Sequence, residues 1–200
     1  PKATSHALKD YHDKKLKIHF ASSADTSEID DILEKCDLDE TLFIFASKSF
    51  KTREVLINHK HIKDKLLKFV KKPKEIQNNF LAITANRNNA LKLGINPKRI
   101  LIFSKTIPGR FSLSSAISFP LLLQIGKSNY TKFINGINKM DAHFKNSKVE
   151  SNIPLLMALI SIWNVNYKNI ISNCILTYNH HLRSFSSFIQ QLGMESYGKS

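Results

Sequence analysis

The chain has 200 residues, of which 42% are hydrophobic, enough for one large domain or somewhat more. It lacks the run of about 18 apolar residues that a membrane-spanning helix needs, so we expect no contact with a membrane. A formal charge of +14 is typical of proteins that bind nucleic-acid phosphates. The lysines are scattered over several segments without aromatic–basic alternation, however, so we interpret the charge as composition bias and expect no nucleic-acid partner.

Short apolar runs alternate with helical patterns in the first part of the chain. The runs, rich in Ile, Phe and Leu, predict buried strands at 16–21, 41–46, 79–84 and 99–103. The helical patterns lie at 26–36, 52–70 and 86–93. Asp25 is a capping signal for the first helix, and Gly94 is a left-handed stop for the third. Alternating strands and helices predict an α/β fold, a doubly wound parallel-sheet sandwich with helices on both faces.

From residue 112 the pattern becomes mainly helical. It predicts helices at 112–125, 130–144, 153–167 and 180–192, and one strand at 171–177. We place a domain boundary near residue 125, which gives a first domain of residues 1–124. Residues 125–200 would begin a second α/β unit that the chain does not complete.

Polar residues follow the second predicted strand at its carboxyl end, where parallel sheets bind ligands. Ser47, Lys48, Ser49 and Thr52 combine hydroxyls, an ammonium group and the N-terminus of a helix, with no acid before Glu54. Such a group of donors suits a phosphate. Ordinary helix capping by Ser and Thr explains the same residues equally well, and spacing alone leaves both interpretations open.

Gly109 and Arg110 follow the fourth predicted strand. Gly109 would permit a tight turn beside a ligand, and Arg110 could hold a developing oxyanion, although a surface arginine is the simpler interpretation. His180 and His181 start a helix without metal spacing, so we take them as cap or surface residues. Cys36 and Cys174 also lack metal spacing, which predicts buried thiols in a reducing, cytoplasmic setting.

The last residues allow two interpretations. Residues 193–200 spell G-x-x-x-x-G-K-S, the formal phosphate loop of a nucleotide hydrolase, which needs a strand before it and a helix after it. The residues before Gly193 have a helical period instead, and no helix follows in the sequence. We therefore favour the second interpretation, in which Glu195 follows Gln190 and Gln191 at the end of an amphipathic helix.

Four motifs occur in an order that resembles the glucose-6-phosphate isomerase family. They are ASKSFKT at 46–52, GRFSL at 109–113, MDAHF at 140–144 and QQLGMESYGK at 190–199. The resemblance covers essentially the whole chain, including SNIPLLMALISIWN at 151–164. It implies a first sugar-isomerase (phosphosugar-binding) domain over residues 1–124 and the beginning of a second over residues 125–200.

The resemblance also implies an activity. Members of this family interconvert glucose 6-phosphate and fructose 6-phosphate through an enediolate, in glycolysis and gluconeogenesis, as cytoplasmic homodimers without metal or cofactor. One carboxylate that moves a proton between neighbouring carbons, and one cation for the charge on oxygen, are what this chemistry requires. By resemblance Glu195 is the catalytic base and Arg110 stabilises the enediolate. The substrate-binding residues implied are Ser47, Lys48, Ser49, Thr52, Gly109 and Gln191.

The chain departs from the family's pattern before the arginine. The family has a stretch with Trp and Asp and a Gly-Gly pair, where this chain reads Ser104, Lys105, Thr106, Ile107 and Pro108. The family's glycine-serine phosphate loop would precede Pro1, and its ring-opening histidine and C-terminal lysine would follow Ser200. We therefore expect an internal fragment, inactive or nearly so by itself. There are three alternatives. The first is a non-catalytic sugar-phosphate-binding module or a decayed isomerase. The second is a basic nucleic-acid binder, and the third is a nucleotide hydrolase.

Overall fold

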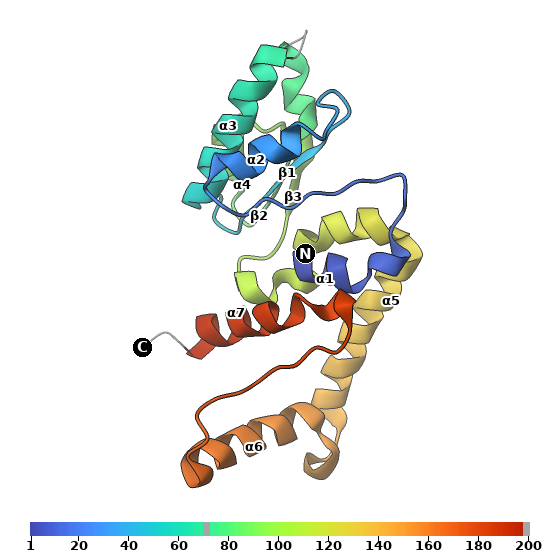
Figure 1. Ribbon diagram of the computed structural model, residues 1–200, viewed down its shortest axis with the longest axis vertical. Coiled ribbons are helices and arrows are strands. Elements are labelled where there is room, and N and C mark those ends of the chain that lie inside the picture. Colours follow the sequence, from blue (N-terminus) through green and yellow to red (C-terminus); the bar gives the residue numbers. More distant parts are fainter. Residues whose placement is uncertain (70–72, 198–200) are drawn as a thin grey trace. The chain divides into compact units, whose positions relative to one another are not determined.

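The computed structural model of the chain describes residues 1–69 and 73–197 (Figure 1). These residues form two compact units. The first comprises residues 14–120 with Pro1, and the second comprises residues 2–13 and 121–200. The assignment of residues 1–124 and 125–200 to two sugar-isomerase domains stays a prediction.

A parallel sheet forms the centre of the first unit. Its strands are β1 (Phe43–Ala46), β2 (Phe80–Thr84) and β3 (Ile100–Ile102), in the order β1-β2-β3. Phe43 lies opposite Phe80, and Ala82 lies opposite Ile100. All five residues of β2 are buried, as is typical of a central strand in a parallel sheet. The predicted α/β class with a parallel sheet is confirmed.

Successive residues of β2 point to opposite faces of the sheet and enter two different cores. Phe80 and Ala82 join a cluster with Ile29 of α2 (Thr26–Leu33), residues of α3 (Arg53–Phe69) and Ala90 of α4 (Arg87–Lys92). Leu81 and Ile83 join a second cluster with Phe103. That other face is covered by Ile107, by the 3-10 turn at Ala116–Ser118 and by Phe119, and a further 3-10 turn at Gly109–Ser114 lies between them in the chain. The predicted helix at 112–125 therefore begins as 3-10 turns.

Helix boundaries in the first unit follow the predicted signals. Asp25 accepts a hydrogen bond from the Ser27 N–H at 3.0 Å and caps α2. Asn86 caps α4 by accepting from the Asn89 N–H at 3.2 Å. Gly94 has a φ of +82°, which confirms the predicted left-handed stop. The predicted end of α3 at Val70 lies outside the described residues.

Two predicted strands are wrong. Residues 16–21 and 171–177 are irregular, and within the described part of the chain the sheet consists of β1, β2 and β3 alone. Leu16 is 44% exposed and Ile171 is 88% exposed, so neither run is buried in a sheet. A strand needs a neighbour that accepts its backbone hydrogen bonds, and a short apolar run does not say whether one exists.

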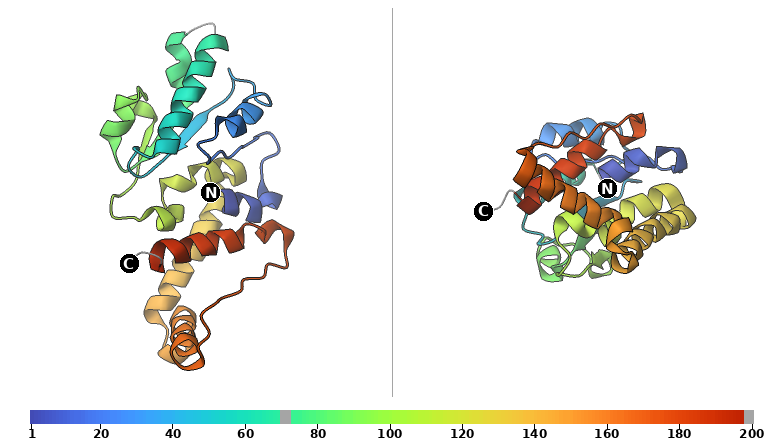
Figure 2. Two further views of the ribbon diagram at one scale, coloured as in Figure 1. Left: turned by 60° about the vertical axis from the view of Figure 1, so that its left-hand side comes forward. Right: turned by 90° about the horizontal axis from the view of Figure 1, so that it is seen from below.

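The second unit is helical. It contains α1 (Lys2–Ala7), most of α5 (Phe119–Asn146), α6 (Ile153–Lys168) and α7 (Phe185–Tyr197), with a 3-10 turn at His180–Leu182. The helices predicted at 130–144 and 153–167 are confirmed, and residues 169–179 connect α6 to the last turn without regular structure (Figure 2). Gly126, with φ 73° and ψ 164°, breaks α5 into two helices. None of the described helices is long and apolar enough to cross a membrane.

Helix α6 exposes apolar side chains instead of burying them. It has no buried residue, and Trp163 stacks on Tyr167 with ring centroids 4.6 Å apart while both rings remain exposed. The exposed set also includes Ile153, Met157, Leu159, Ile160, Ile162 and Val165. A helix with apolar residues on every side is typical of the interior of a larger core.

The burial of His59 in the first unit should make its folding stability depend on pH. His59 lies in α3, 5% exposed, with its ring 5.1 Å from that of Phe45 and 5.3 Å from that of Phe80. Burial, with a smaller contribution from Lys63, lowers the pKa of His59 from its ordinary value of 6.5. The unfolded chain therefore binds this proton more readily than the folded chain, and folding stability falls as the pH drops below about 6.5.

Replacing His59 by Leu should flatten this dependence, because the buried position then has no proton to bind. The measurement is the free energy of unfolding in urea at pH 7.5, 6.5 and 5.5. His19→Gln, at an exposed histidine, is the matched control. An equal slope in the parent chain and in His59→Leu would contradict the assignment of this pH dependence to His59.

Candidate functional site

The loop of residues 47–52 connects β1 to α3 at the carboxyl end of the sheet, and we call it the phosphate loop after the role that the sequence predicts for it. Its first residue continues the parallel ladder, because the Ser47 N–H donates to the Ile83 carbonyl at 3.0 Å. The Ser47 side chain is only 8% exposed. Its Oγ lies 2.7 Å from Thr52 Oγ1 and accepts a hydrogen bond from the Phe50 N–H at 3.1 Å. Ser47 therefore closes the loop from within.

Phe50 anchors the phosphate loop. Its φ is 53°, in the left-handed region that residues with a Cβ seldom adopt, and its ring is 1% exposed in the core around Phe45. The left-handed conformation costs about 1–2 kcal/mol. Burial of a phenylalanine side chain contributes about 1.5–3 kcal/mol, so packing offsets the backbone strain. The loop is thus held in one conformation before any ligand arrives.

The remaining loop residues face solvent. Lys48, Ser49 and Thr52 are all exposed. Within the described residues, the Lys48 side chain makes no hydrogen bond or ion pair. Thr52 directly precedes α3, and its carbonyl accepts from the Leu56 N–H at 3.2 Å. An ammonium group, hydroxyls and a helix N-terminus on one short loop can hold an anion without a metal.

Sequence reasoning missed two residues that hold the phosphate loop from outside. Thr84, the last residue of β2, donates through Oγ1 to the Lys48 carbonyl at 3.1 Å. Asn89 of α4 donates through Nδ2 to the Ser49 carbonyl at 2.8 Å. A polar residue in the otherwise apolar strand FLAIT was the available signal for Thr84. Nothing in the local pattern pointed to Asn89.

Gly109 and Arg110 open the 3-10 turn after β3. The backbone of Gly109 is not left-handed, and a Cβ there would meet nothing within 4 Å, so the turn itself does not require glycine. A turn does form at Gly109, and a close approach of a ligand to it stays a prediction. The Ser112 hydroxyl donates to the Gly109 carbonyl at 2.6 Å. The guanidinium of Arg110 lies 5.1 Å from the ring centroid of Phe111 and is partly buried.

Gln191 and Glu195 lie one turn apart on α7. The Gln191 amide donates through Nε2 to Glu195 Oε1 at 3.0 Å, which orients the carboxylate. Both belong to the second unit, whereas the phosphate loop, Gly109 and Arg110 belong to the first. The structure therefore brings the predicted residues together within each unit: four on the phosphate loop, two after β3 and two on α7.

The histidines and cysteines that the sequence analysis considered also have defined places in the structure. The described residues contain no cluster of His, Cys, Asp or Glu that could hold a metal ion. His180 and His181 start a 3-10 turn that Asn179 caps, and the helix predicted at 180–192 begins only at Phe185. His180 is exposed, as predicted for a surface residue, whereas His181 is partly buried. Cys174 is exposed and Cys36 partly buried, so the prediction of two buried thiols is wrong.

The pattern from Gly193 does not form a nucleotide-binding loop in the part that is described. Gly193 lies inside α7, and its backbone continues the helix through Tyr197. No strand precedes it, since residues 185–192 belong to the same helix. Lys199 and Ser200 lie outside the described residues.

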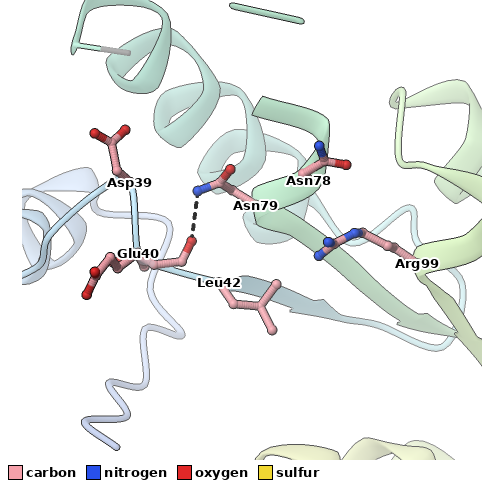
Figure 3. A pocket seen from close by; sticks show the side chains of 7 residues that line it. Asp39, Glu40, Leu42, Asn78, Asn79 and Arg99 are labelled. Atoms are coloured by element: carbon pink, nitrogen blue, oxygen red, sulfur yellow. Dashed lines mark hydrogen bonds between the residues drawn. The ribbon is translucent and has the colours of Figure 1, made fainter. Parts of the chain in front are cut away.

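A hollow of about 420 Å³ lies at the opposite, amino edge of the sheet (Figure 3). It is lined by Asp39, Glu40, Thr41, Leu42, Asn78, Asn79 and Arg99. Asn79 spans part of it, donating through Nδ2 to the Leu38 and Thr41 carbonyls, each at 3.1 Å. Parallel sheets bind ligands beyond the carboxyl ends of their strands, so we assign no part of the site to this hollow.

The two serines of the phosphate loop should respond differently to truncation. Ser47→Ala leaves the buried Phe50 N–H without an acceptor and should destabilise the chain by about 1–2 kcal/mol. Ser49→Ala, at an exposed position, should change stability by less than about 0.5 kcal/mol. Urea denaturation of both variants measures the difference, and equal losses would contradict the bracing role of Ser47.

The sequence of the chain is similar to sequences of one known protein family. The sequence model of the family described as phosphoglucose isomerase matches residues 1–200. Glucose-6-phosphate isomerase of Buchnera aphidicola (subsp. Schizaphis graminum) is 40% identical over 200 residues, which is 100% of this chain and 36% of that protein. The enzyme of Shewanella baltica (strain OS223) is 39% identical over 200 residues, again 100% of this chain, and 37% of its own length is covered. The chain thus spans a little over a third of the length of these relatives.

Solved structures give the same result. The crystal structure of a glucose-6-phosphate isomerase from Chlamydia trachomatis matches with a TM-score of 0.88 and 28% identity, over 100% of this chain and 38% of that one. A hypothetical protein from Thermus thermophilus shares the fold, with a TM-score of 0.82 and 22% identity, over 100% of this chain and 46% of that one. On the match of the family model over all its residues, the chain belongs to the phosphoglucose isomerase family.

Proposed function

We propose that this chain supplies part of the active site of an aldose–ketose isomerase that interconverts glucose 6-phosphate and fructose 6-phosphate. The observation that carries the proposal is the phosphate loop, whose exposed Lys48, Ser49 and Thr52 stand on a braced backbone at the start of α3. Membership of the family supplies the reaction class. The substrate phosphate would accept hydrogen bonds from these side chains and be favoured by the helix dipole.

Glu195 is the proposed base. In the open-chain sugar, its carboxylate takes the proton from C2 of glucose 6-phosphate and returns a proton to C1, which gives the ketose; the reverse reaction takes the proton from C1. Proton transfer by a positioned carboxylate contributes typically about 10²–10⁴-fold to the rate. The hydrogen bond from Gln191 holds one carboxylate oxygen, which leaves Oε2 to accept the proton.

Arg110 is proposed to stabilise the oxygen charge of the enediolate, since a fixed guanidinium favours an anion that develops during reaction. Its contact with the Phe111 ring restricts the guanidinium, which supports a fixed role. Gly109 offers backbone that a ligand can approach closely, because no atom of the chain occupies the space where a Cβ would lie. The proposed reaction needs no metal or organic cofactor.

We further propose that activity requires more polypeptide than these 200 residues. The relatives are nearly three times as long, and α6 exposes apolar residues on all sides, which fits a segment that packs inside a larger protein. The proposed full-length enzyme is a cytoplasmic homodimer with two sugar-isomerase domains, of which residues 125–200 begin the second. Nucleic acid and membrane have no part in this function.

Phosphate recognition can be tested on the chain itself. Lys48→Ala should weaken the binding of fructose 6-phosphate by about tenfold, because a charged hydrogen-bond donor contributes about 1.5 kcal/mol or more. The measurement is titration calorimetry at fixed ionic strength. Lys60→Ala, an exposed position of α3 with the same change of charge, is the matched control and should bind as the parent does. Equal weakening in both variants would indicate a general charge effect and contradict a specific loop.

The role of Glu195 can be tested in a chain lengthened at both ends with the corresponding segments of the Buchnera relative. Glu195→Gln should lower kcat by about 10³-fold and leave the affinity for fructose 6-phosphate nearly unchanged, since the amide keeps the shape but cannot take the proton. The coupled assay of isomerisation measures this. A lengthened parent that binds the sugar phosphate without turnover would favour a non-catalytic binding module instead.

A further inference from the structure

The carbonyl groups of the phosphate loop are held by residues that lie outside it. The Lys48 carbonyl accepts two hydrogen bonds, one from Thr84 Oγ1 and one from the Ala85 N–H, both at 3.1 Å. A carbonyl oxygen has two lone pairs, so this acceptor is fully used. The Ser49 carbonyl accepts from Asn89 Nδ2 at 2.8 Å. Consecutive peptide groups are thus held in place by β2 and α4.

The direction of a carbonyl fixes the direction of the N–H in the same peptide group. In a trans peptide the two point opposite ways, and the described residues contain no cis bond. Because the Lys48 carbonyl points toward the end of β2, the Ser49 N–H points away from it. Rotation of this peptide would turn a carbonyl oxygen to the side where the exposed side chains lie, and that oxygen would repel an anion. The hydrogen bonds from β2 therefore decide whether this peptide attracts or repels a phosphate.

Thr84 and Asn89 are parts of one network. Thr84 Oγ1 donates to Lys48 and also accepts from the Asn86 N–H at 3.0 Å. Asn86 Oδ1 accepts from the Asn89 N–H at 3.2 Å, and the Asn89 side chain returns to the loop. The network runs from the interior to the surface, since Thr84 is 0% exposed whereas Asn89 is only partly buried and its hydrogen bond to Ser49 is exposed. A buried hydroxyl is unfavourable unless it is hydrogen-bonded, and both hydrogen bonds of Thr84 are made at this junction.

We propose that Thr84 and Asn89 are positioning residues for phosphate recognition: they fix the peptides after Lys48 and Ser49 so that the Ser49 N–H is presented to the substrate phosphate. The inference rests on the proposed function of the phosphate loop. Neither residue contacts the ligand. Each acts through the backbone of the loop. The donor that the ligand's phosphate receives is the Ser49 N–H, a backbone group that no side-chain motif reveals.

The test compares Thr84→Val, Thr84→Ser and Asn89→Ala with the parent chain, using fructose 6-phosphate as the probe. Thr84→Val keeps the side-chain shape without the hydroxyl, whereas Thr84→Ser restores it. Asn88→Ala, at the exposed neighbouring asparagine, is the matched control for Asn89→Ala. Binding is followed by calorimetry and by the shift of the Ser49 amide signal in nitrogen-edited NMR spectra. Thermal midpoints report any loss of stability separately.

Thr84→Val and Asn89→Ala should each weaken binding by about fivefold, as expected for one hydrogen bond lost from the network. The Ser49 amide should shift on addition of ligand in the parent chain and in Thr84→Ser, and the shift should be smaller in the two weakened variants. A role in stability alone would lower the thermal midpoint and leave the affinity of the folded chain unchanged. Asn89→Ala decides the question if Thr84→Val does not fold.

The outcomes separate this inference from the function on which it rests. One set of results would overturn the positioning role and leave the proposed role of the phosphate loop standing. In that set the parent binds, Lys48→Ala weakens binding, and both Thr84→Val and Asn89→Ala bind as the parent does. If the folded parent does not bind fructose 6-phosphate, the same variants are compared in the chain lengthened at both ends. If that lengthened chain does not bind either, the proposed function fails and the inference fails with it. A Ser49 amide that never responds to bound ligand would also overturn the inference.

Discussion

The hydrogen-bond ladder between β1 and β2 continues past the last residue of β1, and the arrangement of the first unit depends on that continuation. The Ser47 N–H donates to the Ile83 carbonyl, and the Ala85 N–H donates to the Lys48 carbonyl. The phosphate loop therefore begins as an extension of the sheet. Since β2 is buried along its whole length, its position is fixed by packing on both faces, and this rigidity passes to the loop. A flexible loop would have to lose conformational freedom on binding, and this one has lost it on folding.

The same region shows how the fold tolerates locally unfavourable features. Phe50 adopts a left-handed backbone, and His59 lies between two aromatic rings where its charged form is disfavoured. Both side chains are buried against the face of the sheet that α2, α3 and α4 cover. Burial there stabilises the fold by more than either feature costs. In contrast, α6 lacks such cover, and its apolar residues remain exposed within the described structure.

Elements that depend on the pattern of neighbouring residues could be predicted from the sequence. Elements and contacts that depend on a partner elsewhere in the chain could not. The short, almost entirely apolar run FLAIT and the cap at Asp25 are properties of a few neighbouring residues, so the strand β2 and the start of α2 were predictable. Residues 16–21 and 171–177 have the composition of strands, but whether a strand forms depends on a partner elsewhere in the chain. The loop residues were predictable by type. That Ser47 braces the loop while Ser49 faces solvent was not, because the difference lies in side-chain geometry. Asn89 was missed because 40 residues separate it from its acceptor.

Charge alone would not explain the selective phosphate recognition that is proposed for this loop. The chain carries 30 Lys and Arg residues against 16 acids, so positive potential is present over much of its surface. At physiological ionic strength exposed charges more than about 8 Å apart are largely screened, and a distant lysine adds little to the affinity for one phosphate. What distinguishes the phosphate loop is that its backbone is fixed: Phe50 is buried, Ser47 closes the loop, and the Lys48 carbonyl is held by β2. Backbone donors of a fixed loop lose little entropy when an anion binds, whereas the side chain of an exposed lysine must be ordered first. The proposed recognition would therefore depend on the rigidity of the sheet edge more than on the net charge.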